Sequence, residues 1–428
     1  MTALGFDFGT TNTVLAVQAG DATRSLSFES QAEVTESLRT CLSFMKDKDL
    51  GGLALKVDAG AAAIRSFIDN PGECRFLQSI KTFAASPLFQ STIVHARRHT
   101  FEDLLEVFTR RMMAYAGSGW PTDVTRIVAG RPVRFAGANA DAELAMERYR
   151  TALARFGFPE VHFVMEPVAA AFYFAQHLER DTNVLVADFG GGTTDYSIIR
   201  FEKVAGKVKA QPIGHGGVGI AGDMFDFRII DNVVSPQIGK GGYFRNFGKR
   251  LEIPSNYYAN FGRWNQLSIF KTLRDFQDLK SLVRQAEDPD QLELFVDLIE
   301  HDEGYPLYQA ISKTKFALSS QEEAEFHFEP LGRAGGRVVK RSDFETWIAP
   351  DLALMEKALD ETLADADMLE EDVGAVFLTG GTSFVPAVRN LFRRRFGAER
   401  IEGGGELLSI AHGLALIGER DDIADWTS

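Results

Sequence analysis

Two segments of the chain share one order of residues, and this repeat constrains the fold more than any other feature. Residues 4–17 read LGFDFGTTNTVLAV, and residues 184–199 read VLVADFGGGTTDYSII. Each segment runs from an apolar strand through Asp-Phe-Gly and Thr-Thr to a second apolar strand, and therefore predicts a β-hairpin. Because the same hairpin is expected twice, the chain is expected to form two related lobes.

The turns of both expected hairpins carry glycine and threonine, and their backbone N–H groups can form a concave nest for phosphate oxygens. Asp7 and Asp188 end the first strand of each hairpin. Glycine-rich hairpin turns also occur in proteins that bind no ligand there. Two such turns with aspartate at the same place favour instead two lobes that face one nucleotide.

The rest of the hydrophobic pattern predicts an α/β protein. Short apolar runs bounded by glycine predict buried strands, and apolar residues three and four apart predict helices that cover a sheet. The strands are expected at residues 4–8, 184–189 and 376–378, and the helices at residues 101–115, 140–156, 168–178 and 352–363. Polar breaks at residues 235–242 and 287–290 indicate a helical insertion.

Composition narrows the choice of partners and compartment. The 428 residues carry a formal net charge of −14, which does not favour nucleic acid or an anionic membrane as a partner. Cys41 and Cys74 lie far apart, so neither a disulfide framework nor a zinc site is expected. With no basic and apolar leader and no run of about 18 apolar residues, we expect a cytoplasmic protein.

Four further segments accompany the two hairpins. They are QSIKTF with Lys81, VMEPVAAAF with Glu166, GIAGDMFD at residues 219–226 and VFLTGGTSFVPAV at residues 376–388. In this order, the set resembles the actin-like ATPase superfamily and, within it, the nucleotide-binding domain of the 70-kDa heat-shock (DnaK-type) chaperones. GRPVRF at residues 130–135 and KFALSS at residues 315–320 make the chain most similar to the small YegD-like branch.

This resemblance implies an actin-like ATPase (ribonuclease H-like) fold with two lobes around a nucleotide cleft. Lobe I is expected at residues 1–182, with an inserted subdomain at about residues 26–119. Lobe II is expected at residues 183–403, with an inserted subdomain at about residues 227–311. A final helix, residues 404–420, is expected to return to lobe I, and no peptide-binding domain is expected.

The resemblance also implies a magnesium-ATP site. Asp7 and Asp188 are expected to hold Mg²⁺ through its waters, with Asp195 nearby, because Mg²⁺ gives up its hydration shell reluctantly. Lys81 is expected beside the terminal phosphate, and Glu166 is expected to orient the attacking water. The expected catalytic residues are Lys81, Glu166, Asp188 and Thr193. The phosphate-binding residues are expected to be Gly9, Thr10, Thr11, Asn12, Gly190, Gly191, Gly192, Thr193 and Thr194.

Each of these residue types also has an ordinary structural role. An aspartate can cap a turn, a lysine can be a solvated surface residue, and a glutamate can stabilise a helix N-terminus. A threonine in a hairpin can simply favour the strand. The role of Lys81 therefore depends almost entirely on the resemblance.

The nucleoside is expected beside Gly380, Gly381 and Thr382, with Lys315 and Ser319 as polar neighbours. Phe316 and Phe384 stand where the resembling chaperones have arginines that flank adenine. Two phenyl rings can hold a purine by stacking but lack the donors of arginine, so looser base specificity is expected. The alternative is that both phenylalanines belong to the core.

The function implied by the resemblance is slow hydrolysis of Mg-ATP that opens and closes the cleft, with an unidentified protein partner or client reading the change. Two alternatives remain: a nucleotide-regulated interaction or filament protein without turnover, and a small-molecule kinase of the same superfamily. One departure affects coupling between domains. The chaperones have a Val-Pro-Ala type turn where this chain reads VAGRPVRF, with Arg131 and Pro132 displaced.

Overall fold

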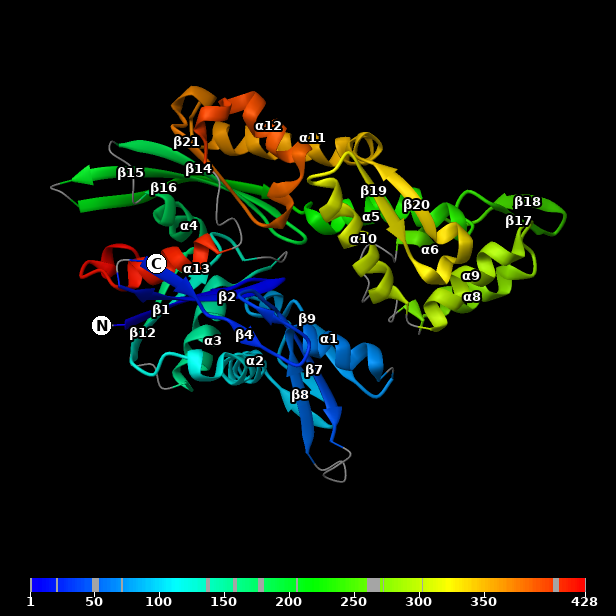
Figure 1. Cartoon of the computed structure of the whole chain (residues 1–428), viewed down its shortest axis with the longest axis horizontal. Helices are drawn as coiled ribbons and strands as arrows, with labels where there is room; N and C mark the ends of the chain where they lie inside the picture. Colours follow the sequence, from blue (N-terminus) through cyan, green and yellow to red (C-terminus); the bar gives the residue numbers. More distant parts are fainter. Residues whose placement is uncertain are drawn as a thin grey trace.

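Two β-sheets form the centres of two lobes, which lie one above the other in Figure 1. The structure is a computed structural model. It describes residues 2–20, 22–47, 54–70, 72–135, 139–156, 160–175, 181–204, 207–259, 270–271, 273–301, 303–402 and 408–427. Lobe I denotes the elements from β1 to α4 together with α13, and lobe II denotes the elements from β14 to β22.

The sheet of lobe I has the strand order β13-β12-β1-β2-β3. The first hairpin supplies β1 and β2, which pair antiparallel, whereas β12 and β13 run parallel to β1. A short strand, β6, also pairs with β2. The bounds are β1 Thr2–Phe8, β2 Asn12–Ala19, β3 Ala22–Ser25, β6 Leu38–Arg39, β12 Val124–Arg131 and β13 Glu160–Met165.

Residues of β1 alternate between the two faces of this sheet, as the period of a strand requires. Leu4, Phe6 and Phe8 pack against α2 (Phe101–Ala116) and α3 (Ala142–Ala154). Gly5 faces α13 (Ser409–Gly418), where an added Cβ would overlap the backbone oxygen of Ala411. The absence of a side chain at Gly5 therefore lets the last helix approach the sheet closely.

The outer part of lobe I is a small antiparallel sheet with flanking helices. Its three strands have the order β8-β7-β9, and η1, a single 3₁₀ turn, follows the last of them. The bounds are β4 Phe28–Glu29, β5 Val34–Thr35, β7 Cys41–Lys46, β8 Leu55–Ala59, α1 Gly60–Asp69, β9 Arg75–Gln78, η1 Ile80–Phe83, β10 Thr92–Val94, β11 Arg97–His99 and η2 Gly117–Gly119.

The sheet of lobe II has the strand order β16-β15-β14-β21-β22. The second hairpin supplies β14 and β15, and β21 runs parallel to β14. Helices α11 and α12 cover one face, as the upper part of Figure 1 shows. The bounds are β14 Thr182–Phe189, β15 Thr194–Val204, β16 Lys207–Val218, α11 Arg341–Asp365, η7 Glu370–Asp372, β21 Ala375–Thr379, η8 Gly381–Phe384, α12 Pro386–Phe396, η9 Ala398–Arg400 and β22 Ile401–Glu402.

Helices α4 (Glu166–Ala175) and α13 join the two lobes, because they lie between the two sheets (Figure 1). Val168 and Phe172 of α4 and Leu414 of α13 share one apolar cluster with Val184 and Val186 of the lobe II sheet. The lobes are therefore connected by packed helices at one end.

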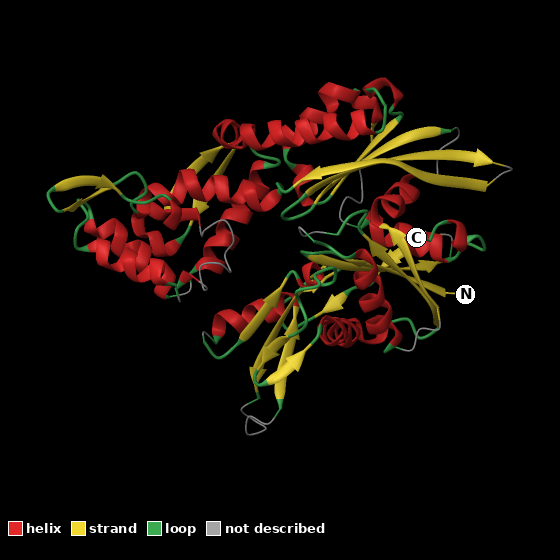
Figure 2. Cartoon of the chain, turned by 180° about the vertical axis from the view of Figure 1, so that it is seen from behind, coloured by secondary structure: helices red, strands yellow, loops and turns green. Residues whose placement is uncertain are grey.

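The outer part of lobe II is mostly helical, with two hairpins (Figure 2). The bounds are α5 Gly222–Ile229, η3 Ile230–Val234, η4 Ser235–Ile238, β17 Tyr243–Asn246, β18 Lys249–Glu252, α6 Asn256–Ala259, α8 Arg274–Val283, α9 Pro289–Glu300, α10 Gly304–Leu318, β19 Glu323–His327, η6 Glu329–Gly335 and β20 Gly336–Lys340, and η10 Ile423–Asp425 follows α13. Within the described residues, no helix is long and apolar enough to cross a membrane.

Both predicted hairpins are present, and the α/β fold class is confirmed. The four predicted helices correspond to α2, α3, α4 and part of α11. Helix α4 begins two residues earlier than expected, and residues 176–178 of that prediction lie outside the described residues. The lobe boundaries at residues 182 and 403 stay predictions.

Candidate functional site

The two hairpin turns come from different lobes and meet each other. A Cβ added at Gly191 of the second turn would lie 2.7 Å from the hydroxyl of Thr11 in the first. Asp7 pairs with Val14 across the first hairpin, and Asp188 pairs with Asp195 across the second. The arrangement therefore brings both turns and all three predicted metal-binding aspartates to one place between the lobes.

The first turn is held by a residue from outside the hairpin. A Cβ at Gly9 would overlap the backbone oxygen of Asn12, so the tight turn requires glycine here. The hydroxyl of Thr40 donates to the oxygen of Gly9 at 2.8 Å, and its N–H donates to the oxygen of Thr11 at 2.8 Å. The Thr13 and Thr40 hydroxyls also hydrogen bond at 2.8 Å. Thr10, Thr11 and Asn12 keep access to solvent.

The second turn closes on itself. The N–H of Gly190 donates to the oxygen of Thr193 at 2.9 Å, and the hydroxyl of Thr193 donates to Asp195 Oδ2 at 2.9 Å. Gly192 and Thr193 are exposed. Thr194, predicted among the phosphate-binding residues, differs from Thr193, because its buried hydroxyl donates to the oxygen of Ile220 at 2.7 Å. The hydroxyl of Thr194 is therefore engaged away from the exposed residues of the turn.

Lys81 and Glu166 of lobe I form an ion pair beside the two hairpin turns, with Lys81 Nζ 2.5 Å from Glu166 Oε1. Lys81 lies on η1, and Glu166 opens α4 directly after β13. Burial lowers the pKa of Lys81, but the carboxylates of Glu166 and Asp7 outweigh this effect and leave the pKa raised. Lys81 is therefore a buried ammonium at neutral pH.

The aspartates around this pair have raised pKa values. Burial, with the charges of Glu166 and Asp188, raises the pKa of Asp7 well above its ordinary value. Burial, with Asp195 and Glu166, raises the pKa of Asp188 to about 7. Burial also raises the pKa of Asp195, although Asp195 keeps access to solvent, as expected in the wall of a cleft.

This excess of carboxylates over ammonium fits a divalent cation. Among the described residues, no three Asp, Glu, His or Cys side chains are arranged to hold a metal directly. Because Mg²⁺ usually keeps several of its waters, Asp7, Asp188 and Asp195 fit a hydrated Mg²⁺ better than a directly ligated ion.

The predicted nucleoside residues gather in lobe II. A Cβ added at Gly222 would lie 2.9 Å from the hydroxyl of Thr382 and 3.3 Å from Lys315 Nζ, so α5, η8 and α10 meet there. Lys315 Nζ lies 2.9 Å from Asp226 Oδ1 and donates to the oxygen of Gly222 at 3.1 Å. Gly380 has φ +83°, and an added Cβ would overlap the oxygen of Phe189, so glycine is required.

Phe316 and Phe384 do not belong to the core. The exposed fraction is 75% for Phe316 and 36% for Phe384. The guanidinium of Arg389 lies 5.8 Å from the centre of the Phe384 ring, and Arg389 Nε donates to the oxygen of Ser383 at 3.0 Å. Ser319 is half-buried, and its hydroxyl donates to the oxygen of Lys315 at 3.4 Å. Arg389 is a neighbour that the sequence pattern did not indicate.

The lobes also meet through side chains of their outer parts. Arg39 on β6 of lobe I hydrogen bonds to Tyr308 on α10 of lobe II. Tyr305, one turn earlier on α10, packs against Cys41 and Ile64 of lobe I. The two lobes therefore contact each other on both sides of the hairpin turns.

These features define an α/β protein of the actin-like ATPase fold. The family model described as "Hsp70 protein" matches residues 123–241 and 296–419, which is more than half of the chain. The chain belongs to the Hsp70 family, a family of chaperone-type ATPases, and the predicted likeness to an Hsp70-type nucleotide-binding domain is confirmed. The YegD-like branch stays a prediction.

Among curated proteins, the chain is similar to proteins named "Chaperone protein DnaK". The one from Deinococcus proteolyticus is 23% identical over 97% of this chain and 58% of its own length. The one from Deinococcus deserti is 23% identical over 97% and 59%, and that of Mycoplasmopsis synoviae is 24% identical over 98% and 59%. The chain thus spans somewhat under 60% of the length of these relatives.

Proposed function

We propose that the chain binds Mg-ATP between the two hairpin turns and hydrolyses it slowly. The main support for this proposal is the buried Lys81–Glu166 pair. It lies near the carboxylates of Asp7 and Asp188, where the hairpin turns of the two lobes meet. Membership of the Hsp70 family supports the same assignment. A protein that only packed two lobes together would gain nothing from this concentration of buried charge.

Phosphoryl transfer requires mainly positioning and charge neutralisation, because its transition state spreads charge over the phosphate oxygens. The Lys81 ammonium supplies a fixed positive charge for the terminal phosphate. Glu166, which holds Lys81, is placed to orient the attacking water. The exposed N–H groups of Gly192 and Thr193 and the turn from Thr10 to Asn12 bind the phosphate oxygens from opposite sides.

Asp7, Asp188 and Asp195 hold Mg²⁺ through its waters in this proposal. When bound, the ion supplies positive charge to the phosphate oxygens. The three carboxylates lose their protons when the cation binds, because a hydrated cation favours their charged forms.

The base binds between Phe316 and Phe384 in this proposal. Lys315 and Ser319 contact the nucleoside, and the backbone of Gly380, Gly381 and Thr382 lies against it. The exposure of both rings supports a stacking role. Because phenyl rings offer no hydrogen-bond donor to a base edge, ATP and other purine triphosphates are expected to bind with similar affinity.

Hydrolysis is proposed to change the angle between the lobes, and a protein partner or client is proposed to read the change. The relatives of this chain are chaperones by name, which supports a protein partner.

The proposed compartment is the cytoplasm. Cys41 and Cys74 are free thiols, which fits a reducing environment.

Steady-state phosphate release from Mg-ATP by the purified protein and by Lys81→Ala tests this proposal. Lys280→Ala is the matched control, because Lys280 pairs with Glu300 at the far end of lobe II. We expect wild type and Lys280→Ala to turn over equally, and Lys81→Ala to lose about 10²-fold or more of kcat. Nucleotide binding without turnover in wild type would instead indicate a nucleotide-regulated interaction protein.

A further inference from the structure

Arg148 of α3 is buried, with 8% of its surface exposed, and its guanidinium binds backbone oxygens. It donates to the oxygens of Phe83 at 2.8 Å, Ala84 at 2.9 Å, Ser86 at 3.1 Å and Phe89 at 2.7 Å. Within the described parts of the chain, no carboxylate forms an ion pair with Arg148. The rigid fork of guanidinium donors therefore binds one short stretch of backbone.

That stretch begins at Phe83, two residues after Lys81 and the last residue of η1. Lys81 lies on η1, and a single 3₁₀ turn has too few internal hydrogen bonds to fix its own position. Before η1, the N–H of Ser79 donates to the oxygen of Thr40 at 3.2 Å, and Thr40 in turn holds the first hairpin turn. At the end of η1 and just after it, the four bonds from Arg148 fix the chain. Lys81 is thus held between the first hairpin turn and α3.

We propose that Arg148 is a positioning residue for Lys81, which it holds against Glu166 by binding the backbone at the end of η1 and just after it. This inference rests on the proposed function, in which Lys81 acts on the terminal phosphate. A lysine side chain has a flexible four-carbon stem, so the place of its ammonium depends on where its backbone lies. A displacement of about 1 Å in such a group can cost about 10²-fold in rate.

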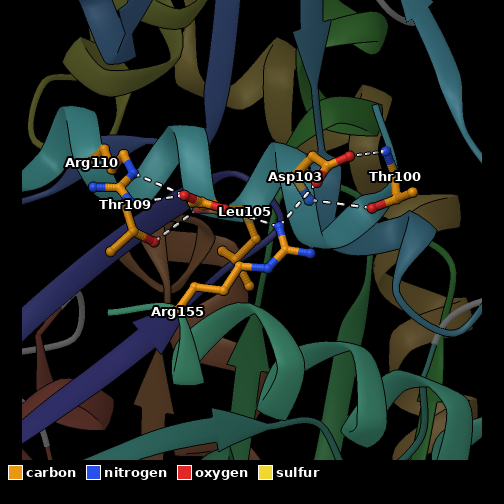
Figure 3. A network of polar contacts seen from close by, with 7 residues as sticks. Thr100, Asp103, Leu105, Thr109, Arg110 and Arg155 are labelled. Carbon is orange, nitrogen blue, oxygen red and sulfur yellow. Dashed lines mark hydrogen bonds and ion pairs between the residues drawn. The ribbon is translucent and has the colours of Figure 1, made fainter. Parts of the chain in front are cut away.

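Arg155, at the end of the same helix, offers a matched control. It donates to Asp103 Oδ1 and to Glu106 Oε2, both at 2.9 Å, and so ties α3 to α2 (Figure 3). Its contacts lie on the outer side of lobe I and do not include the segment that carries Lys81. Arg155 therefore has the structural role without the positioning role.

The first readout is kinetic. In Arg148→Met, which keeps most of the stem and removes the donors, we expect kcat for ATP to fall about 10- to 100-fold while KM changes less than about twofold. Arg148→Lys retains the charge but not the fork, so its kcat is expected to lie between those of wild type and Arg148→Met. Arg155→Met is expected to match wild type. An unchanged kcat in Arg148→Met would overturn the proposal.

The second readout does not need ATP hydrolysis. Limited acetic anhydride labelling of the nucleotide-free protein, followed by mass spectrometry, compares the reactivity of Lys81 with that of Lys315 as internal reference. In Arg148→Met we expect Lys81 to react about tenfold faster, because an ammonium that is no longer held against Glu166 gives up its proton and meets the reagent more readily, while Lys315 is unchanged. An unchanged Lys81 reactivity would contradict the positioning role.

The two readouts separate this inference from the proposed function. If wild type does not hydrolyse ATP, the proposed function fails, and the labelling of Lys81 alone decides the role of Arg148. Thermal unfolding checks that each variant folds. If Arg148→Met does not fold, Arg148→Lys is judged by the same two readouts, and wild-type kcat together with wild-type labelling in that variant would overturn the proposal.

Discussion

The two hairpins begin from the same residues but contribute differently to the site. The turn of lobe I is held by Thr40, which lies between β6 and β7, and the Lys81–Glu166 pair lies beside it. The turn of lobe II closes by its own bonds and has Asp188 and Asp195 directly opposite each other. Lobe I therefore supplies the buried ammonium, whereas lobe II supplies two of the three metal-binding aspartates and the nucleoside residues.

This difference predicts a division of labour. Substitutions beside the lobe I turn should lower turnover more than binding, and substitutions in lobe II should affect binding of the cation and the base. A common backbone motif can be repeated while the side chains that extend from it diverge, because the nest of N–H groups depends on backbone geometry alone. The predictions below test this division.

The largest effect is expected for Glu166→Gln in lobe I. The amide still reaches Lys81 but cannot accept a proton or hold the ammonium as an ion pair, so kcat should fall about 10²- to 10⁴-fold. The dissociation constant for Mg-ATP, measured by calorimetry, should change little. Glu160→Gln is the control, since Glu160 is exposed at the start of β13 and pairs with Arg126. A large loss of affinity in Glu166→Gln would break the proposed division.

A smaller effect is expected for Mg²⁺ in lobe II. Below pH 7, protons compete with Mg²⁺ for Asp188, whose pKa is about 7, so the Mg²⁺ needed for half-maximal turnover should fall as the pH rises from 6 to 8. Asp188→Asn should raise this concentration about 10- to 100-fold and flatten the dependence on pH. Phosphate release over a Mg²⁺ titration measures both. Equal pH dependence in wild type and Asp188→Asn would assign the titration to another group.

The loss of one phenyl ring should weaken base binding by a factor similar to, or smaller than, the effect of Asp188→Asn on the Mg²⁺ requirement. Phe316→Ala is expected to weaken binding of ATP and GTP alike, by about 1–3 kcal/mol for the lost stacking. Competition with a fluorescent nucleotide measures both affinities. Phe247→Ala is the control, because Phe247 is 99% exposed at the tip of the β17–β18 hairpin. If wild type bound ATP much more tightly than GTP, the proposed lack of base specificity between the two phenyl rings would be contradicted.

The smallest effect is expected for the contact between the outer parts of the lobes. Tyr308→Phe removes the hydrogen bond to Arg39 and keeps the ring. It should therefore destabilise the arrangement in which the two lobes touch here by about 0.5–1.5 kcal/mol. Nucleotide release, followed by stopped-flow fluorescence, should accelerate about two- to tenfold. The rate constant for hydrolysis in a single turnover should stay unchanged. An unchanged release rate would show that this contact does not restrain opening.

Much of the fold follows from local pattern. The short apolar runs and the repeated Asp-Phe-Gly turn predict both hairpins, because an apolar run that ends at a glycine-containing turn is typical of a hairpin strand. The same repeat places Asp7 and Asp188 at equivalent positions. Periodicity alone does not single out Lys81 or Glu166, and only the likeness to the heat-shock chaperones indicated them.

Other parts of the site depend on contacts between distant segments, which no local pattern records. Thr40 and Arg148 act by binding backbone oxygens far away in sequence, and threonine and arginine occur in many places without such a role. The contact of Arg39 with Tyr308 joins two lobes. The sequence left Phe316 open between core and ligand site, since an aromatic residue on a helix fits both until its exposure is known.

A crystal structure of the chain with Mg²⁺ and a non-hydrolysable ATP analogue tests most directly whether both hairpin turns bind one nucleotide. The account predicts one analogue, with its phosphates in contact with both Thr11 and Gly191 and its terminal phosphate beside Lys81. It also predicts that the cation contacts Asp7 and Asp188 through water. An analogue bound to one lobe alone, or away from Lys81, would contradict the account.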